Sequence, residues 1–193
     1  SSDVCSSDLV LGTRNRAIEL TKGTYIMFCD SDDWMEDDCL ETLALATDYG
    51  KADRVIAQFK DVDQDGKILQ VQDLPKNPSK WICGVHHGTM YKRQIFIDYN
   101  IRFKAFYPDD VYINVMFNQH CTDVRFIHKT IYNWYVHMDS TSRKQDEKSP
   151  WVGKQLFQQV LSYMIPIMEN KKNEQDKDII GQYIMTMENK KAA

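Results

Sequence analysis

Three aspartates follow an apolar run near the start of the chain, and they are the residues best placed to do chemistry. The run is "YIMFC", from Tyr25 to Cys29, and Asp30, Asp32 and Asp33 come directly after it. Carboxylates at this spacing repel one another unless a cation or solvent compensates them. A hard ion such as Mg²⁺ or Mn²⁺ prefers oxygen ligands and is commonly shared between carboxylates and substrate phosphates. The cluster therefore predicts a metal–phosphate site; the alternative is that one aspartate only caps the next helix.

A second acidic pair, Asp109 and Asp110, follows Pro108 and precedes residues with the apolar spacing of a helix. The pair is expected at a helix N-terminus, where acidic residues cap the helix and interact favourably with its dipole. A carboxylate in the same place can also act as a general base that takes the proton of an attacking hydroxyl. The residues alone leave both interpretations open.

The segments around the three aspartates alternate as in an α/β sheet. A short helix is predicted for residues 14–23, ended by Gly23, and a buried strand for residues 25–29. Residues 35–50 predict an amphipathic helix with an acidic first turn and Gly50 at its end. Ligands of such sheets bind beyond the carboxyl ends of the strands, which is where the aspartates lie.

The rest of the chain predicts further strands and helices. Residues 54–59 predict a strand, residues 88–103 a strand and a short helix, and residues 107–120 a loop leading into a helix. Two short strands are expected within residues 124–137. A polar loop follows, and helices are expected after Trp151.

Residues 61–72 resemble the first half of a calcium-binding EF-hand loop, with Asp61, Asp63 and Asp65 at alternate positions. The twelfth position is Gln72 instead of the bidentate glutamate, and the flanks have the pattern of strands. An Asp-Gly turn between two strands is therefore predicted here. A non-enzymatic calcium-binding module over this segment is kept as an alternative function.

The composition is that of an ordinary globular protein, with 193 residues, 42% of them hydrophobic and 27% charged, which is enough for one domain. A net charge of -4 gives no basic surplus, so nucleic acid is not an expected partner. The five cysteines form no CxxC pair, which argues for a reducing compartment and against a disulfide framework or zinc ribbon. No apolar run approaches the roughly 18 to 20 residues that span a bilayer. A cytoplasmic location is expected, with peripheral association at the inner face of the membrane left open.

Four segments in order resemble family 2 glycosyltransferases with the GT-A fold. The first, "GTRNRAIELTKGTYIMFCDSDDWMEDDCLETL", has the family's succession of an Arg-Asn pair, a helix bounded by glycine, an apolar strand and a DxD motif. The others are "MYKRQIFIDYNIRF", "PDDVYINVMF" and "YNWYVHMDSTSRK", so the resemblance covers residues 11–144. Each motif alone is weak, but four in the same order are specific.

The resemblance implies an enzyme that transfers a sugar, with inversion, from a nucleotide diphosphate donor. The acceptor would be a glycan, a lipid-linked sugar or a polymer, in cell-surface polysaccharide synthesis. Asp32 would bind the Mn²⁺ or Mg²⁺ ion that bridges the diphosphate, and Asp30 would lie near the ribose or the metal. Asp33 would not bind the metal itself but would hold these two aspartates in place. Arg14 and Asn15 match the residues at the family's nucleotide site.

The same resemblance makes Asp110 the catalytic base, while the metal stabilises the charge of the departing diphosphate. The family usually has Glu-Asp at this point, so the shorter Asp109 departs from its pattern. His137 is a candidate third metal ligand. Ser142 and Arg143 are candidates for holding the diphosphate.

The remaining polar and aromatic candidates are weaker. His86 and His87 have no matching ligand set in the sequence, and no role is assigned to them. Trp81, Trp134 and Tyr135 are candidates for a sugar-stacking wall, although such residues more often belong to an aromatic core.

Three regions are expected: residues 1–9 as a non-native leader or artefact, residues 10–145 as the C-terminal part of a GT-A catalytic domain, and residues 146–193 as a helical extension. Family members have a nucleotide-binding βαβ half before the arginine helix. The chain is therefore expected to be an N-terminally truncated fragment that is inactive alone. The competing enzyme class is a metal-dependent nucleotidyl or phosphoryl transferase. It would predict a glycine-rich phosphate loop, and the sequence contains none.

Overall fold

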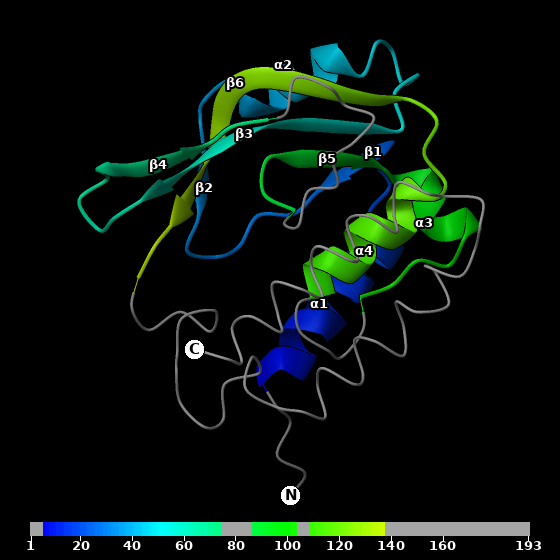
Figure 1. Cartoon of the computed structure of the whole chain (residues 1–193). Coiled ribbons are helices and arrows are strands. Elements are labelled where there is room, and N and C mark those ends of the chain that lie inside the picture. The colour runs from blue at the N-terminus through cyan, green and yellow to red at the C-terminus, as the bar shows by residue number, and fades with distance from the viewer. Residues whose placement is uncertain (1–5, 75–85, 104–108, 138–193) are drawn as a thin grey trace, which may run out of the picture.

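The computed structural model describes residues 6–74, 86–103 and 109–137, and this part of the chain forms a six-stranded sheet covered by helices (Figure 1). In the view of Figure 1, α1, α3 and α4 lie below the sheet and α2 lies above it. The helices are α1 (Ser6–Leu20), α2 (Cys39–Ala46), α3 (Arg93–Asp98) and α4 (Asp109–Asn118). The strands are β1 (Tyr25–Met27), β2 (Trp34–Met35), β3 (Arg54–Val62), β4 (Ile68–Gln72), β5 (Thr89–Lys92) and β6 (Val124–Tyr135).

The sheet is mixed. Its order is β1-β5-β3-β6-β2, and β4 pairs with β3 outside this path. β3 and β6 run parallel, whereas β5 lies antiparallel between β1 and β3, and β2 is antiparallel to β6. The predicted α/β sheet with flanking helices is confirmed, and it is mixed because β2, β4 and β5 are antiparallel to their neighbours whereas β3 and β6 are parallel.

Both faces of the central strand β3 are buried. On one face, Val55, Ala57 and Phe59 pack with Leu43 of α2 and Ile131 of β6 in one core cluster. The opposite face carries a group of aromatic rings with centroids 4.9 to 6.3 Å apart, mostly edge to face, which stabilises packing beyond the area buried. These rings belong to Phe28, Tyr91, Phe96, Phe103 and Phe117. The sheet is thus fixed between two packed layers, and so are the loops at its strand ends.

Two helices differ from the prediction in their bounds. α1 begins at Ser6 instead of residue 14, so it extends into the segment that the sequence predicts to be a leader, and it ends at Leu20, before the predicted end at Gly23. α2 begins at Cys39, because Trp34–Met35 pairs with β6 as the short strand β2. The predicted end of α2 at Gly50 was also wrong, since the helix ends at Ala46.

Residues 124–135 form one strand of 12 residues, so the prediction of two short strands in this region was wrong. Ala57 of β3 pairs with Ile127, but the next residue, Gln58, pairs with Thr130, so His128 and Lys129 lie in a bulge. Both bulged residues are exposed. A bulge places consecutive residues on one side and interrupts the alternation of a strand, which explains why the pattern looked like two strands.

The segment 61–72 is a strand–turn–strand unit, as predicted. β3 and β4 pair antiparallel on either side of the turn. The Asp63 carboxylate accepts the backbone N–H groups of Asp65 at 3.0 Å and of Lys67 at 2.9 Å, and Gly66 takes φ +76°. An EF-hand loop needs helices on both sides, and strands flank this one.

None of the helices in residues 6–74, 86–103 and 109–137 is long and apolar enough to cross a membrane. The polar loop predicted after residue 137 and the helices predicted after Trp151 lie outside the described residues.

Candidate active site

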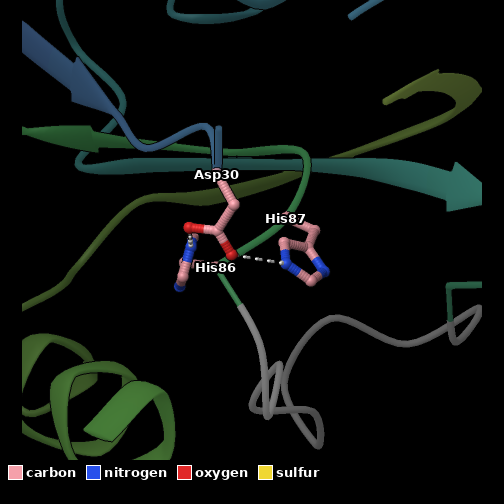
Figure 2. A group of neighbouring side chains, drawn as sticks. All are labelled: Asp30, His86 and His87. Atoms are coloured by element: carbon pink, nitrogen blue, oxygen red, sulfur yellow. Dashed lines mark ion pairs between the residues drawn. The ribbon is translucent and has the colours of Figure 1, made fainter. Parts of the chain in front are cut away.

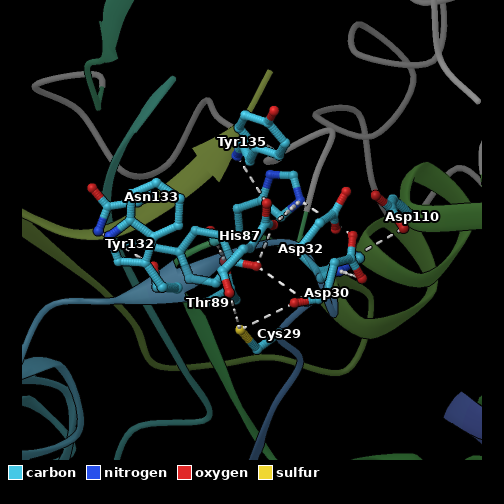
Figure 3. A network of polar contacts seen from close by, with 12 residues as sticks. Cys29, Asp30, Asp32, His87, Thr89, Asp110, Tyr132, Asn133 and Tyr135 are labelled. Atoms are coloured by element: carbon cyan, nitrogen blue, oxygen red, sulfur yellow. Dashed lines mark hydrogen bonds and ion pairs between the residues drawn. The ribbon is translucent and has the colours of Figure 1, made fainter. Parts of the chain in front are cut away.

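The residues that carry chemistry come together just beyond the end of β1 (Figure 3). They come from five separate parts of the chain, so the site exists only in the folded chain. Asp30, Asp32 and Asp33 follow β1, Arg14 lies on α1, His86 and His87 precede β5, Asp110 lies in the first turn of α4, and Tyr132 and Tyr135 belong to β6, with His137 just after it.

Asp30 and Asp110 share two cationic partners. Arg14 Nη2 donates to Asp30 Oδ1 at 2.7 Å, and Arg14 Nη1 lies 3.5 Å from Asp110 Oδ1. His86 Nδ1 donates to Asp110 Oδ1 at 2.9 Å, and its Nε2 lies 3.5 Å from Asp30 Oδ1. We refer to Arg14, Asp30, His86 and Asp110 as the four-residue network. It brings together three residues that the sequence predicted for the site and adds His86.

The charges of this network support one another. Burial disfavours the ionised form of Asp30, but hydrogen bonds from His86 and His87 and the charges of His86 and Arg14 hold its pKa below the usual range. Burial likewise opposes ionisation of Asp110, and His86 and Arg14 outweigh it and lower its pKa. Burial disfavours the charged form of His86, yet Asp110 and Asp30 raise its pKa to about 9. At neutral pH the Asp110 carboxylate is therefore ionised.

His87 lies on the other side of Asp30 (Figure 2). Its Nε2 is 3.7 Å from Asp30 Oδ2 and 3.7 Å from Asp33 Oδ2. The ring stacks on Tyr132 with centroids 5.2 Å apart and is almost fully buried. Its Nδ1 is buried and has no hydrogen-bond partner within the part of the chain that the structure describes. His87 thus presents one nitrogen to the carboxylates from an otherwise aromatic surrounding.

Asp33 attaches the loop of residues 28–33, which we call the aspartate loop, to β6. Its side chain is fully buried, accepting the Tyr132 hydroxyl at Oδ2 (2.6 Å) and the Tyr135 backbone N–H at Oδ1 (2.9 Å). The same Tyr132 oxygen accepts the backbone N–H of Asp30 at 3.2 Å. Burial raises the pKa of Asp33, and burial together with Asp33 raises that of Tyr132. Asp33 therefore supports the loop from behind and does not face the open side of the site.

Asp32 and His137 form an open pair. His137 Nε2 lies 3.3 Å from Asp32 Oδ2, and their side chains are 32% (His137) and 48% (Asp32) exposed. One carboxylate and one imidazole leave most of a coordination sphere free for phosphate oxygens or water. The chemistry and the openness of this pair fit a divalent ion, and the assignment of both residues as metal ligands stays a prediction.

A second group that can hold a metal is Asp30, His86 and His87, whose ligand atoms all lie within 4.8 Å of one another (Figure 2). Two imidazoles favour an ion such as Mn²⁺ or Zn²⁺ over Mg²⁺. However, Arg14 already pairs with Asp30, and Asp110 already pairs with His86. Arg14 Nη2 also lies 3.5 Å from His86 Nε2, so a cation in this group would be close to the guanidinium. Mutual repulsion makes this second group the poorer fit.

Asn15 is used inside the protein. Its Nδ2 donates to the Phe103 carbonyl at 3.0 Å, and its Oδ1 accepts the Phe103 backbone N–H at 2.8 Å. These bonds fix α1 against the segment after α3 and thereby help to direct the neighbouring Arg14, which lies over the Phe103 ring at 5.3 Å. Contact of Asn15 with a nucleotide remains a prediction.

The other candidates are placed as follows. Asp109 is the first residue of α4. Trp134 packs against the core cluster, with its ring 6.4 Å from that of Phe59, so the alternative of an aromatic core applies to it. Tyr135 stacks on His137 with centroids 5.1 Å apart. Outside the described residues lie Trp81, Ser142 and Arg143.

The sequence assigned no role to His86 and His87, and the structure places both against Asp30. The missing signal has a physical cause. His86 meets Arg14 and Asp110, which are 72 and 24 positions away in the chain. A pattern of neighbouring residues cannot reveal such contacts. The one available hint was the His-His pair itself, which comes just before a predicted strand.

Comparisons with known proteins identify the family and the fold of the chain. The model of "Glycosyl transferase family 2" matches residues 10–117. In fold, the chain is similar to TarS of S. aureus in complex with UDP-GlcNAc, with a TM-score of 0.63 at 15% identity over 90% of this chain and 51% of that one.

Two curated relatives carry the names of glycosyltransferases. EpsH of Bacillus subtilis (strain 168) is 25% identical over 89% of this chain and 54% of its own length. The amylovoran biosynthesis glycosyltransferase AmsB of Erwinia amylovora is 39% identical over 33% of this chain and 22% of its own length. The chain thus spans about half the length of EpsH and less than a quarter of the length of AmsB. Because the family model covers residues 10–117 of the 193, the chain belongs to glycosyl transferase family 2.

Proposed function

We propose that this chain forms the catalytic part of an inverting glycosyltransferase that uses a nucleotide diphosphate sugar as donor. The observation that carries the proposal is the four-residue network, which holds the Asp110 carboxylate ionised beside the aspartate loop. Family membership supports sugar transfer, and the similarity to TarS with bound UDP-GlcNAc supports a nucleotide-sugar donor. The sugar itself is left unassigned.

In the proposed reaction, the acceptor hydroxyl attacks the anomeric carbon while the Asp110 carboxylate takes its proton. Arg14 and His86 keep this carboxylate ionised, which is the charge state that the step requires at neutral pH. Asp32 and His137 would hold a Mn²⁺ or Mg²⁺ ion, with Asp30 close to the metal or the ribose. When bound, such an ion supplies stabilisation of the charge on the departing diphosphate.

Several further assignments belong to the same proposal. Arg14 would contact the nucleotide, Asp109 would assist at the start of α4, and Ser142 and Arg143 would hold the diphosphate. We assign residues 10–145 to the catalytic domain and residues 146–193 to a helical extension, and the family match from residue 10 supports the first boundary.

The acceptor that we propose is a growing glycan, a lipid-linked sugar or a polymer in cell-surface polysaccharide synthesis. The name of AmsB, which refers to amylovoran biosynthesis, supports a polysaccharide. A reaction on a lipid-linked acceptor would take place at the cytoplasmic face of a membrane, with the protein associated peripherally.

The test is Asp110→Asn in the full-length protein, assayed with a panel of nucleotide sugars. Asparagine keeps the shape of the side chain and loses its proton affinity, so turnover should fall by roughly 10²- to 10⁴-fold while donor affinity persists. Asp98→Asn, on the exposed side of α3, is the matched control. Near-normal turnover of Asp110→Asn would remove it as the base, and loss in Asp109→Asn instead would reverse the roles of the pair.

A further inference from the structure

His86 connects Asp30 and Asp110, two carboxylates that the proposed reaction uses. It lies just before β5, its side chain is 1% exposed, and its ring meets the edge of Phe28 at 5.8 Å. Nδ1 lies 2.9 Å from Asp110 Oδ1, and Nε2 lies 3.5 Å from Asp30 Oδ1. Because both nitrogens face carboxylates and the ring is packed, the imidazole has one orientation.

The backbone beneath His86 is equally fixed. Gly88 has φ +62°, and a Cβ at this position would lie 2.9 Å from the Ala57 carbonyl oxygen of β3. The Gly88 carbonyl accepts the Ala57 N–H at 2.9 Å, and the His86 carbonyl accepts the Thr89 N–H at 3.2 Å. A tight turn against the central strand β3 therefore fixes the backbone position of His86. A site with precise geometry requires rigid support of this kind.

We propose that His86 is a positioning residue for the base. By binding Asp110 Oδ1 through Nδ1, it directs Oδ2 toward the acceptor hydroxyl. Through Nε2, which faces Asp30, it also fixes the orientation of Asp110 relative to Asp30 on the donor side. The inference rests on the proposed function and adds to it a residue outside the four segments that resemble the family. A core that needed only packing would not bury charged groups here, because removing charges from water is costly.

Two substitutions separate the two contacts of the ring. In His86→Asn, the amide nitrogen takes the place of Nδ1 and still donates to Asp110. In His86→Gln, the amide nitrogen takes the place of Nε2 and reaches Asp30 instead. We expect His86→Gln to lower kcat by ~10- to 100-fold with little change in the KM of the donor, as supporting hydrogen bonds of catalytic groups commonly do. His86→Asn should retain most of kcat.

The matched control is His128→Asn, which changes an exposed histidine in the bulge of β6. All variants are compared in the full-length protein after circular dichroism has established equal folding. If His86→Gln retains kcat, or if His86→Asn loses as much as His86→Gln, the contact with Asp110 does not position the base.

A measurement independent of turnover separates this inference from the proposed function. With ¹⁵N-labelled histidine, the His86 Nδ1–H proton should resonate far downfield and should move upfield in Asp110→Asn. Absence of this change overturns the inference even if the enzyme is active, and its presence supports the bond even if no donor sugar has been found. Nitrogen coupling to bound Mn²⁺ that disappears in His86→Asn would make His86 a metal ligand and would also overturn the positioning role.

Discussion

Asp32 and Asp33 are neighbours in one loop, yet their side chains have opposite surroundings. The Asp33 carboxylate is fully buried and receives the Tyr132 hydroxyl, whereas the Asp32 side chain is 48% exposed beside His137. A buried carboxylate with hydrogen-bond partners is held in place and stabilises the fold. A solvent-exposed carboxylate is available to bind a ligand. The aspartate loop is therefore anchored to β6 by Asp33, which lies outside the Asp30–Asp32 segment that resembles a DxD motif.

Removal of the Tyr132 hydroxyl should loosen this loop. Tyr132→Phe leaves the buried Asp33 with one fewer donor and Asp30 N–H without its acceptor, so we expect a loss of about 1–3 kcal/mol in the free energy of unfolding. Donor affinity should fall as well, because Asp30 and Asp32 lie in the same loop. Denaturant unfolding and calorimetry measure the two effects. Tyr49→Phe, at a fully exposed tyrosine, is the control, and equal midpoints for both variants would contradict the anchoring role.

At this scale, the sequence could predict the residues that occur in compact motifs. Arg14, Asp30 and Asp110 were predicted for the site and do converge. His86 could not be predicted, because its importance depends on two partners that only the folded sheet brings near. The separate surroundings of Asp32 and Asp33 were equally hidden, since side-chain direction in a loop follows from its tertiary contacts.

Among the elements, the start of β3 is held by one carboxylate. Asp53 Oδ2 accepts the Thr122 N–H and hydroxyl, both at 2.8 Å, and the Asp123 N–H at 3.2 Å. Its Oδ1 lies 3.3 Å from Lys92 Nζ. Asp53 thus joins the start of β3, the end of β5 and the connection from α4 to β6, so it fixes three parts of the fold to one another.

The pH dependence of stability should reflect this carboxylate. Burial favours the neutral form of Asp53, but its hydrogen bonds outweigh burial and keep its pKa below the usual value. A lowered folded-state pKa means that the contribution is complete above the unfolded pKa of about 3.9 and disappears as pH falls through the folded value. Urea unfolding should therefore show Asp53→Asn to be about 1–3 kcal/mol less stable than the parent at pH 7.

This difference should shrink as the pH falls below about 4, where the parent loses the same charge. Asp98→Asn, at an exposed position of α3, should differ little from the parent throughout. A constant difference between Asp53→Asn and the parent across the pH range would assign the effect to packing instead of charge.

The prediction of elements succeeded where periodicity is unbroken and failed where pairing decides. Helix α4 and the turn of residues 61–72 follow local patterns, and both were predicted. β6 was divided in error because of its bulge, and β2 was missed because two residues become a strand only by pairing with β6. The antiparallel place of β5 in the sheet likewise depends on long-range hydrogen bonds.

For the whole molecule, ligand binding should appear as added stability. The aspartate loop, α1, α4 and β6 all contribute to the site, so the proposed donor and metal would bind only the folded chain. A ligand at a hundredfold excess over its Kd adds about 2.7 kcal/mol to folding, which corresponds to a rise of several degrees in Tm.

We therefore expect Mn²⁺ together with UDP to raise the Tm of the full-length protein, and a chelator to remove the rise. Asp32→Ala should lack most of the shift while keeping the parent Tm without ligand, because an exposed loop carboxylate contributes little to the core. Asp37→Ala, at an exposed acid of the same connection, is the control. A full shift in Asp32→Ala would exclude it from the metal site.

The turn at Gly88 has a consequence for how this protein tolerates change. A side chain there would collide with the Ala57 carbonyl, and the left-handed φ is unfavourable for other residues, so the position admits glycine almost alone. In a saturation scan scored by activity, position 88 should be as intolerant as position 110 although it touches no reacting group. Protein abundance would tell them apart: substitutions of Gly88 should deplete the folded protein, whereas Asp110→Asn should leave its amount unchanged.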